Sequence, residues 1–172
     1  MNTAQDAHDA VDAIVAQWKQ EIPTLASENM ALIGRIRRIS MMLNAYLEQE
    51  FVKHSLNNWQ FDVLATLRRS GPPYTLTPTA LFSSMMVSSG TMSTRLKHLE
   101  ADGLIERLPN PEDARSLLVK LSDKGFELIE KAVFPHVDNE ARLLASLPQE
   151  VRQRLEADVK LLLKVVEEAV GG

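Results

Sequence analysis

Small and hydroxyl-bearing side chains gather at the start of one predicted helix, which runs from about residue 88 to Gly103. Hydroxyl groups and a lysine can donate hydrogen bonds to phosphates and to base edges, and small side chains let a backbone come close to a DNA groove. The start of a helix adds free backbone donors for a phosphate. The residues predicted to contact DNA are Ser88, Ser89, Gly90, Thr91, Ser93, Thr94 and Lys97.

Helical periodicity separates this polar face from a buried one. With Met92 at the origin and 100° per residue, Leu96 falls at about 40° and Leu99 at about −20°. Arg95 falls at about −60°, beside the buried face and away from Lys97. The alternative is an ordinary solvated helix rich in serine and threonine, but these residues are poor helix formers. The pattern therefore favours a DNA-contacting face.

A short proline-marked segment, residues 108–125, interrupts the helical pattern directly after that helix. Leu104 to Arg107 and Leu117 to Leu121 resemble two short strands around a charged tip. Arg115 at the tip is predicted to enter the minor groove, where a guanidinium is favoured in narrow A/T tracts. Asp113 is expected to hold the arginine or the loop. A surface salt bridge between the two, which would contribute little, is the alternative.

The elements that must position these residues are almost all helical. Helices are expected over residues 6–21, 28–53, 56–69, from Pro78 with Thr77 as cap, over 122–147 with a bend at Pro135, and from Pro148 onward. Short helix, turn, helix and hairpin form the pattern of a winged helix-turn-helix. The expected fold is mainly α with a small β-hairpin wing, comprising a winged helix-turn-helix lobe and a helical dimerisation region.

Three regions are expected to form one intertwined domain. Residues 1–27 form an added N-terminal helix, 28–54 with 122–172 form the dimerisation region, and 55–121 form the DNA-binding lobe. The apolar faces of the helical arms lack partners in a single chain. A homodimer with interdigitating N- and C-terminal helices would cover them.

Composition narrows the class of protein. The chain has 172 residues, no cysteine and a net charge of −4, so no disulfide or thiolate zinc site is expected. Residues 56–125 hold eight basic and seven acidic side chains, so this segment is near +1 and the remainder carries −5. No secretory leader and no apolar run of ~20 residues is recognisable. A cytoplasmic protein without membrane contact is expected.

The stretch "SSGTMSTRLKHLEADGLIERLPNPEDARSLLVKLSDKG" resembles the multiple antibiotic resistance regulator (MarR) family. The similarity covers the helix, a Leu-Glu-x-x-Gly-Leu-Ile joint, an Asp-x-Arg-Ser wing and a Leu-Ser-x-x-Gly exit, in which Ser122 stands where threonine is more usual. The flanking "FDVLATLRRSGPPYTLTPTAL" and "WKQEIP" are similar to the urate-responsive PecS-like branch of that family. The resemblance implies a transcription regulator, most simply a repressor, that binds a palindromic operator as a homodimer.

The same resemblance implies a binding site for urate or a related anionic purine. Its ligand-binding roles would fall on Trp18, Asp62, Arg95 and Arg107, and no cofactor is implied. The residue chemistry agrees in part, because arginines can clamp a planar anion and an indole offers a stacking face. Asp62 lies in a strongly apolar helix, where a carboxylate needs a cationic partner.

Three of these four positions also have a simpler interpretation. Asp62 shares a stripe with Thr66 and Arg69 and could belong to a surface ion pair. Trp18 could be a core anchor of its helix, and Arg107 could contact a phosphate.

Other functions remain open with less support. No glycine-rich phosphate loop, nucleophile elbow or carboxylate pair indicates an enzyme. His8 and Asp12 have the i, i+4 spacing of a weak zinc-site signal. The alternatives are therefore a regulator that responds to a phenolic acid, an aconitate-like acid or a metal, a DNA-binding protein without an effector, or an oligomerisation module.

Overall fold

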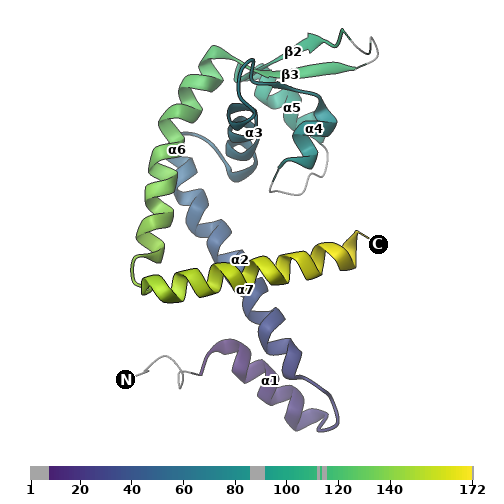
Figure 1. Cartoon of the computed structure of the whole chain (residues 1–172), viewed down its shortest axis with the longest axis vertical. Helices are drawn as coiled ribbons and strands as arrows, with labels where there is room; N and C mark the ends of the chain where they lie inside the picture. Colours follow the sequence, from purple (N-terminus) through teal and green to yellow (C-terminus); the bar gives the residue numbers. More distant parts are fainter. Residues whose placement is uncertain (1–7, 86–91, 112, 114–115, 172) are drawn as a thin grey trace. The chain divides into compact units, whose positions relative to one another are not determined.

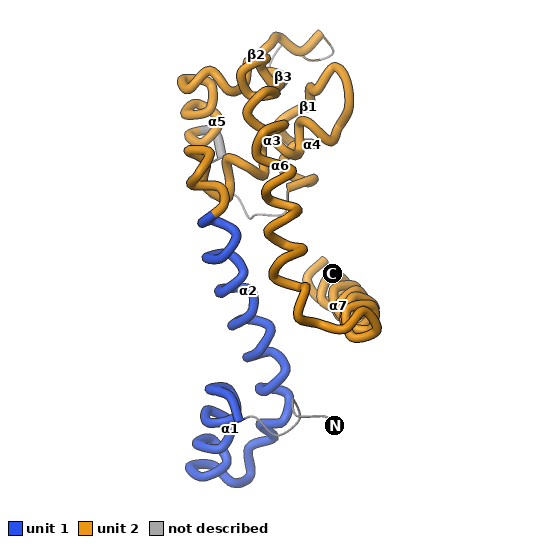
Figure 2. Tube along the Cα trace, turned by 90° about the vertical axis from the view of Figure 1, so that its left-hand side faces the viewer, with its two compact units in different colours: residues 1–49 blue, residues 50–172 orange. Residues whose placement is uncertain are grey.

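The computed structural model describes residues 8–85, 92–111, 113 and 116–171. The chain divides into two compact units, Met1–Gln49 and Glu50–Gly172, which Figure 2 colours separately. The long helix α2 begins in the first unit, and its last residues belong to the second.

The first unit consists of two helices, α1 (Ala10–Glu21) and most of α2 (Glu28–Val52). Asp9 caps α1 in extended backbone conformation, and its carboxylate accepts hydrogen bonds from the backbone amides of Val11 and Asp12. Asp12 accepts in return from the Asp9 amide, which completes a capping box. Val11 is the residue of α1 that becomes buried. The sequence-expected helix over residues 6–21 therefore starts at the carboxylate cap.

The second unit carries the lobe that the sequence predicted. Its elements follow the order α3 (Asn58–Arg69), β1 (Thr75–Leu76), α4 (Pro78–Ser83), α5 (Met92–Ala101), β2 (Ile105–Pro109), β3 (Leu117–Leu121), α6 (Asp123–Leu144) and α7 (Gln149–Val170). Figure 1 labels these elements except β1, which is labelled in Figure 2. The first turns are capped by side chains suited to that role: Asn57 caps α3, Thr77 caps α4 and Ser122 caps α6. Pro78 occupies the first position of α4, where a missing amide hydrogen costs nothing.

Apolar side chains from α3, α4, α5, the sheet and α6 form the core of the lobe. Those that are almost fully buried include Val63, Leu64, Leu67, Leu81, Leu99, Ile105, Val119 and Ile129. The end of α2 joins this core through Phe51, whose ring stacks on Phe61 of α3 at a centroid distance of 4.2 Å. His136 of α6 lies against both rings. This packing gives α5 and the wing a rigid support.

The described residues of this mainly helical protein contain one small β-sheet, which forms the wing. The sheet has three strands, whereas the sequence predicted two. The strands are antiparallel in the order β1-β3-β2. The additional strand, β1, pairs Thr75 with Lys120 and Leu76 with Val119. A two-residue strand shows no alternation in the sequence, and only its tertiary pairing with β3 defines it.

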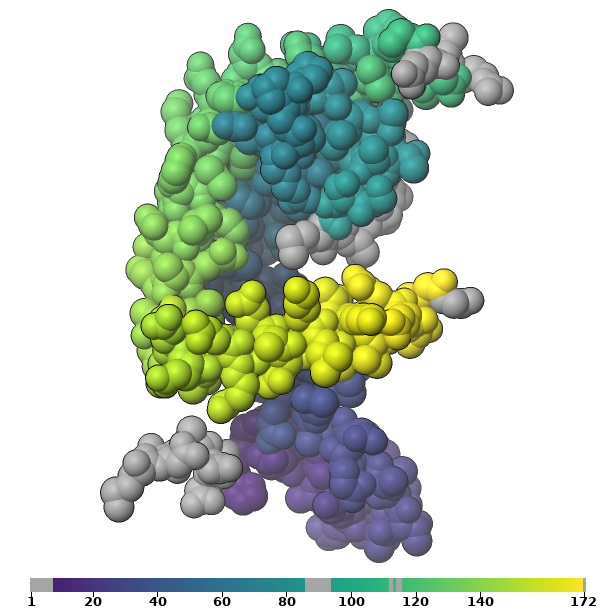
Figure 3. Space-filling view, in the orientation of Figure 1, coloured from purple at the N-terminus to yellow at the C-terminus, as the bar shows by residue number. Residues whose placement is uncertain are grey.

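Several helices leave apolar surface uncovered in the single chain. In the described part of α7 no residue is buried, although Leu155, Val159 and Val166 form an apolar stripe along it. Figure 3 shows this helix in yellow as a continuous ridge of side chains. Across the described residues, no helix combines the length and the apolar character needed to cross a membrane.

Candidate nucleic-acid interface and effector residues

The helix α5 has the two faces that the helical wheel predicts. Leu96 is 3% exposed and Leu99 is fully buried, while Thr94 and Lys97 are exposed. Ser93 belongs to α5 through its backbone. The predicted contacts Ser88, Ser89, Gly90 and Thr91 lie outside the described residues. The described face of α5 therefore offers one hydroxyl and one ammonium group to a partner, with the core leucines behind them.

The turn between β2 and β3 is closed by side chains that the sequence analysis did not single out. Asn110 donates from its side-chain amide to the Ser116 hydroxyl at 2.8 Å, and its backbone amide donates to the Ser116 carbonyl at 3.3 Å. The Ser116 hydroxyl also donates to the Asp113 carbonyl at 3.2 Å. Asparagine and serine around a proline are typical of turns closed by side chains, which is the signal that could have identified this pair.

Asp113 lies within this turn, and its backbone forms two of the turn's hydrogen bonds. Its amide donates to the Asn110 carbonyl and its carbonyl accepts from the Ser116 amide at 3.0 Å. Its side chain is exposed. Arg115, the predicted minor-groove contact, lies outside the described residues. Asp113 and Ser116, the described residues on either side of Arg115, are held by the hydrogen bonds of the turn.

A tight junction joins α5, the wing and α6. The Ser122 hydroxyl donates to the Gly103 carbonyl at 2.7 Å and accepts from the Gly125 amide at 2.9 Å. Gly103 adopts a left-handed conformation, with φ of 70°. A Cβ atom at Gly125 would lie 2.1 Å from the Leu104 carbonyl oxygen, so the backbones meet there without room for a side chain. These residues are the Gly and Ser-x-x-Gly positions of the sequence motif.

Asp62 is buried, at 7% exposure, and its neighbour Thr66 on α3 is 1% exposed. Asp62 and Thr66 therefore do not lie on the surface, as the ion-pair interpretation of their stripe with Arg69 assumed. Arg69 instead donates to the Ser84 carbonyl. A carboxylate buried in an apolar lobe is costly unless polar or charged groups interact with it.

Arg95 lies within α5, and Arg107 lies on β2, the strand that follows α5 in the chain. Arg95 is half-buried, and its guanidinium carbon lies 5.3 Å from the centre of the Trp59 ring on α3, within cation–π distance. Arg95 thus contacts α3 of the same chain, on the side of α5 on which the helical wheel places it. Arg107 on β2 lies with its Nε 3.3 Å from a carboxylate oxygen of Glu100 on α5. Arg95 therefore belongs to the helix that carries Lys97, and Arg107 lies against that helix at Glu100.

Trp18 belongs to the first unit, whereas the other three predicted effector residues belong to the second. Its side chain is 40% exposed, so it is not a core anchor of its helix within the single chain. An exposed indole on an added helix is available for stacking.

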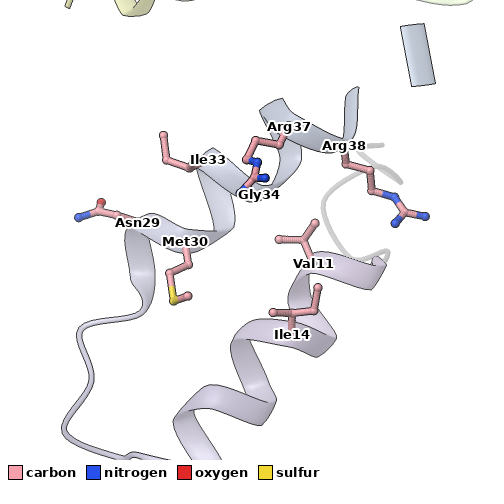
Figure 4. Close-up of a pocket in the computed structure, with 8 residues that line it drawn as sticks. All are labelled: Val11, Ile14, Asn29, Met30, Ile33, Gly34, Arg37 and Arg38. Atoms are coloured by element: carbon pink, nitrogen blue, oxygen red, sulfur yellow. The ribbon is translucent and has the colours of Figure 1, made fainter. Parts of the chain in front are cut away.

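A hollow of about 470 Å³ lies in the first unit, and the residues that line it are shown in Figure 4: Val11, Ile14, Asn29, Met30, Ile33, Gly34, Arg37 and Arg38. None of the four predicted effector residues lines it.

The carboxylate of the His8 and Asp12 pair already has an arginine partner. Asp12, which the sequence pairs with His8, accepts a hydrogen bond from Arg35 at 2.5 Å. In the part of the chain that the structure describes, no group of three or more His, Cys, Asp and Glu side chains is arranged to hold a metal.

Comparison with known proteins finds relatives that are similar to this chain in sequence and in fold. A family profile described as the MarR family matches residues 56–117. The transcriptional regulator PecS from Dickeya dadantii is 39% identical over 147 residues, covering 86% of this chain and 89% of PecS. A mutant MarR from E. coli complexed with operator DNA matches with a TM-score of 0.69 and 26% identity, covering 85% of this chain and 97% of that chain. A MarR-like regulator from Bacillus cereus matches with a TM-score of 0.73 and 26% identity, covering 83% and 99% of the two chains.

Proposed function

Because the chain belongs to the MarR family of DNA-binding transcription regulators, we propose that it is a repressor that a small anionic effector, such as urate, releases from DNA. It binds a palindromic operator as a homodimer and acts in the cytoplasm, where that DNA lies. The proposal has three parts, which are the DNA-contacting surface, the dimer and the effector site.

The DNA-contacting surface is the exposed face of α5 together with the wing. The observation that carries this part is the division of α5, which buries Leu96 and Leu99 and exposes Thr94 and Lys97. The similar E. coli MarR has been crystallised with operator DNA, which supports the same use here. The proposed contacts are Ser88, Ser89, Gly90, Thr91, Ser93, Thr94 and Lys97 in the major groove and Arg115 in the minor groove. Asp113 and the turn around it hold the wing tip.

Dimerisation is supported by the uncovered apolar faces of α2 and α7. Exposed apolar side chains recur along α7, and a second copy of the chain would remove them from water. Two recognition helices about 34 Å apart would then meet successive major grooves on one side of a palindrome.

The effector site is proposed to comprise Trp18, Asp62, Arg95 and Arg107. Burial of Asp62 and the inward direction of Arg95 support it. Arginines can bind a planar anion with paired hydrogen bonds, and Trp18 can cover its ring. Because Arg95 belongs to α5, a ligand bound there shifts the helix that contacts DNA. A coupling free energy of ~1–3 kcal/mol changes operator affinity by a factor of about 5 to 150.

The DNA-binding part is tested by fluorescence anisotropy with labelled DNA from upstream of the protein's own gene and an unrelated duplex of equal length. Lys97→Ala should weaken operator binding several-fold, and the slope of log affinity against log salt should become shallower by about 1 for each phosphate that the protein no longer neutralises. Lys131→Ala, an exposed lysine on α6, is the matched control and should leave both quantities unchanged. Equal binding to both duplexes, or equal effects of the two variants, would contradict the assignment of α5.

The effector part is tested by thermal shift with urate, xanthine, hypoxanthine, salicylate and aconitate. A ligand that binds only the folded state raises the melting temperature. Stabilisation by purines alone supports the proposed effector, and stabilisation by salicylate or aconitate alone overturns it in favour of another ligand class.

A further inference from the structure

A cluster of three charged residues connects the two helices of the first unit. Arg35 of α2 donates from Nε to Oδ2 of Asp9 at 2.7 Å and from a terminal nitrogen to Oδ1 of Asp12 at 2.5 Å. The three side chains are between 32% and 46% exposed, so the cluster lies at the edge of the contact between α1 and α2. One arginine thus engages two carboxylates from the first turn of α1.

The two carboxylates serve the helix and the arginine at the same time. Asp9 uses Oδ1 to cap the amides of Val11 and Asp12, which leaves Oδ2 for Arg35. Asp12 uses Oδ2 for the Asp9 amide, which leaves Oδ1 for Arg35. Because the capping box holds both carboxylates in place, the first turn of α1 must be formed before Arg35 can bind both of them.

The remaining attachment of α1 is steric and lies next to this cluster. Val11 is 5% exposed, whereas Ile14 is 49% exposed and Trp18 is 40% exposed. Gly34 of α2 allows the close approach, since a Cβ atom there would lie 3.0 Å from a methyl group of Val11. Figure 4 shows Val11 facing the turn of α2 that contains Gly34. Farther along α1, Lys19 and Glu28 approach only to 3.9 Å and are exposed. The first turn therefore provides the specific attachments of α1.

The position of Trp18 follows from that attachment. Trp18 comes seven residues after Val11, which in a helix is about two turns, or about 10 Å, along the same face. Because α1 is attached at its first turn, detachment of that turn would move the indole of Trp18.

We propose that Arg35 is a positioning residue for effector binding, because it docks α1 on α2 through Asp9 and Asp12 and thereby sets the place of Trp18. This inference rests on the proposed function in one respect, namely that Trp18 contacts the effector. Arg35 itself does not contact the effector, and its removal leaves Asp62, Arg95, Arg107 and the DNA-contacting face of α5 unaltered.

Three readouts on the full-length chain test the inference: amide hydrogen exchange of α1, urate affinity by calorimetry, and operator affinity without urate. Arg35→Ala should accelerate exchange in α1 and weaken urate binding, each by roughly threefold or more, as expected when two surface ion pairs are removed. Gly34→Leu should do the same by a separate route, since its side chain displaces Val11. Arg35→Lys should recover part of both effects. Operator affinity without urate should stay within about twofold in every variant.

The control is Lys131→Ala, an exposed lysine of α6 that lies outside the first unit. It should change neither exchange in α1 nor urate affinity. Unchanged exchange in Arg35→Ala would show that the cluster does not dock α1. Faster exchange with unchanged urate affinity would show that docking does not position the ligand contact, and this also overturns the inference.

A chain that does not bind urate at all would give a result distinct from both of these outcomes. If the unaltered chain binds no urate, the proposed function fails and the positioning role falls with it, while exchange in α1 still decides whether Arg35 docks the helix.

Discussion

At the scale of single residues, the lobe depends on a few positions where side-chain size or hydrogen bonding is constrained. Gly125 and Ser122 join α5, the wing and α6. The sequence motif marks both, but it does not show that Gly125 meets the Leu104 carbonyl. Burial of Asp62, by contrast, could be anticipated from its apolar neighbours in α3. Contacts between distant residues are set by tertiary packing, which local patterns do not encode.

Gly125→Ala should destabilise the protein although alanine is the better helix former. Its Cβ would lie 2.1 Å from a backbone oxygen, and relief of such overlap costs ~1–3 kcal/mol or more. Thermal unfolding should therefore show a melting temperature lowered by several degrees. Gly71→Ala is the comparison, because open space surrounds Gly71 and only its left-handed φ of 79° opposes a side chain. That variant should lose ~1 kcal/mol. An unchanged or raised melting temperature for Gly125→Ala would contradict the described junction.

The pKa of the Asp9 carboxyl should report directly on Arg35. The hydrogen bond from the Arg35 side chain, together with capping by backbone amides, lowers the pKa of Asp9 from the ordinary value of 3.8 to about 2. A lowered pKa stabilises the folded form above pH 3.8, and this contribution is lost as the pH falls toward 2. In Arg35→Ala the pKa of Asp9, measured by NMR titration, should rise toward 3.8 while staying below it because the amide caps remain. The same low pKa in the variant would contradict the ion pair.

At the scale of elements, the order of helices and strands could be predicted from the sequence in most of its parts. The caps Thr77 and Ser122 mark the starts of their helices, and Leu96 and Leu99 define the buried face of α5. The strand β1 could not be predicted, because two residues show no periodicity. Only one part of the docking of α1, namely the local cap of its first turn, could be predicted from the sequence. The Asp9 and Asp12 capping box follows a local pattern, whereas Arg35 lies 26 residues away from Asp9.

The closure of the wing turn should matter for DNA binding more than for stability. Asn110→Ala removes the 2.8 Å hydrogen bond to Ser116 at a partly buried site. A hydrogen bond of this kind contributes ~0.5–1.5 kcal/mol, so operator affinity should fall by up to about tenfold through loss of order at the wing tip. The double variant Asn110→Ala, Ser116→Ala should lose little more than the larger of the two single losses, measured by anisotropy. Additive losses, or none, would show that the pair does not hold the wing.

At the scale of the whole molecule, the proposed dimer would cover apolar surface that the single chain leaves exposed. The described part of α7 buries no residue, yet its apolar stripe is continuous. The predicted effector residues also divide between the two compact units, with Trp18 in the first. The sequence could indicate the residue types of this site but not how the units meet.

Val159→Lys should convert the proposed dimer into monomers. Val159 is 59% exposed in the single chain, so the substitution costs a monomer little, whereas a buried unpaired charge in an interface costs several kcal/mol. Light scattering after gel filtration should give the mass of one chain, about 19.2 kDa, and operator affinity should collapse. Lys160→Ala next to it is the control and should remain dimeric. A variant that stays dimeric would exclude this stripe from the interface.

The central claim is that an anionic effector releases the protein from its operator, and titration of the preformed protein–DNA complex with urate tests it most directly. We expect saturating urate to weaken operator affinity by a factor of about 5 to 150, and operator DNA to weaken urate binding by the same factor. Arg95→Ala should abolish this response while the protein still binds DNA. Operator affinity that is unchanged at saturating urate would contradict the claim.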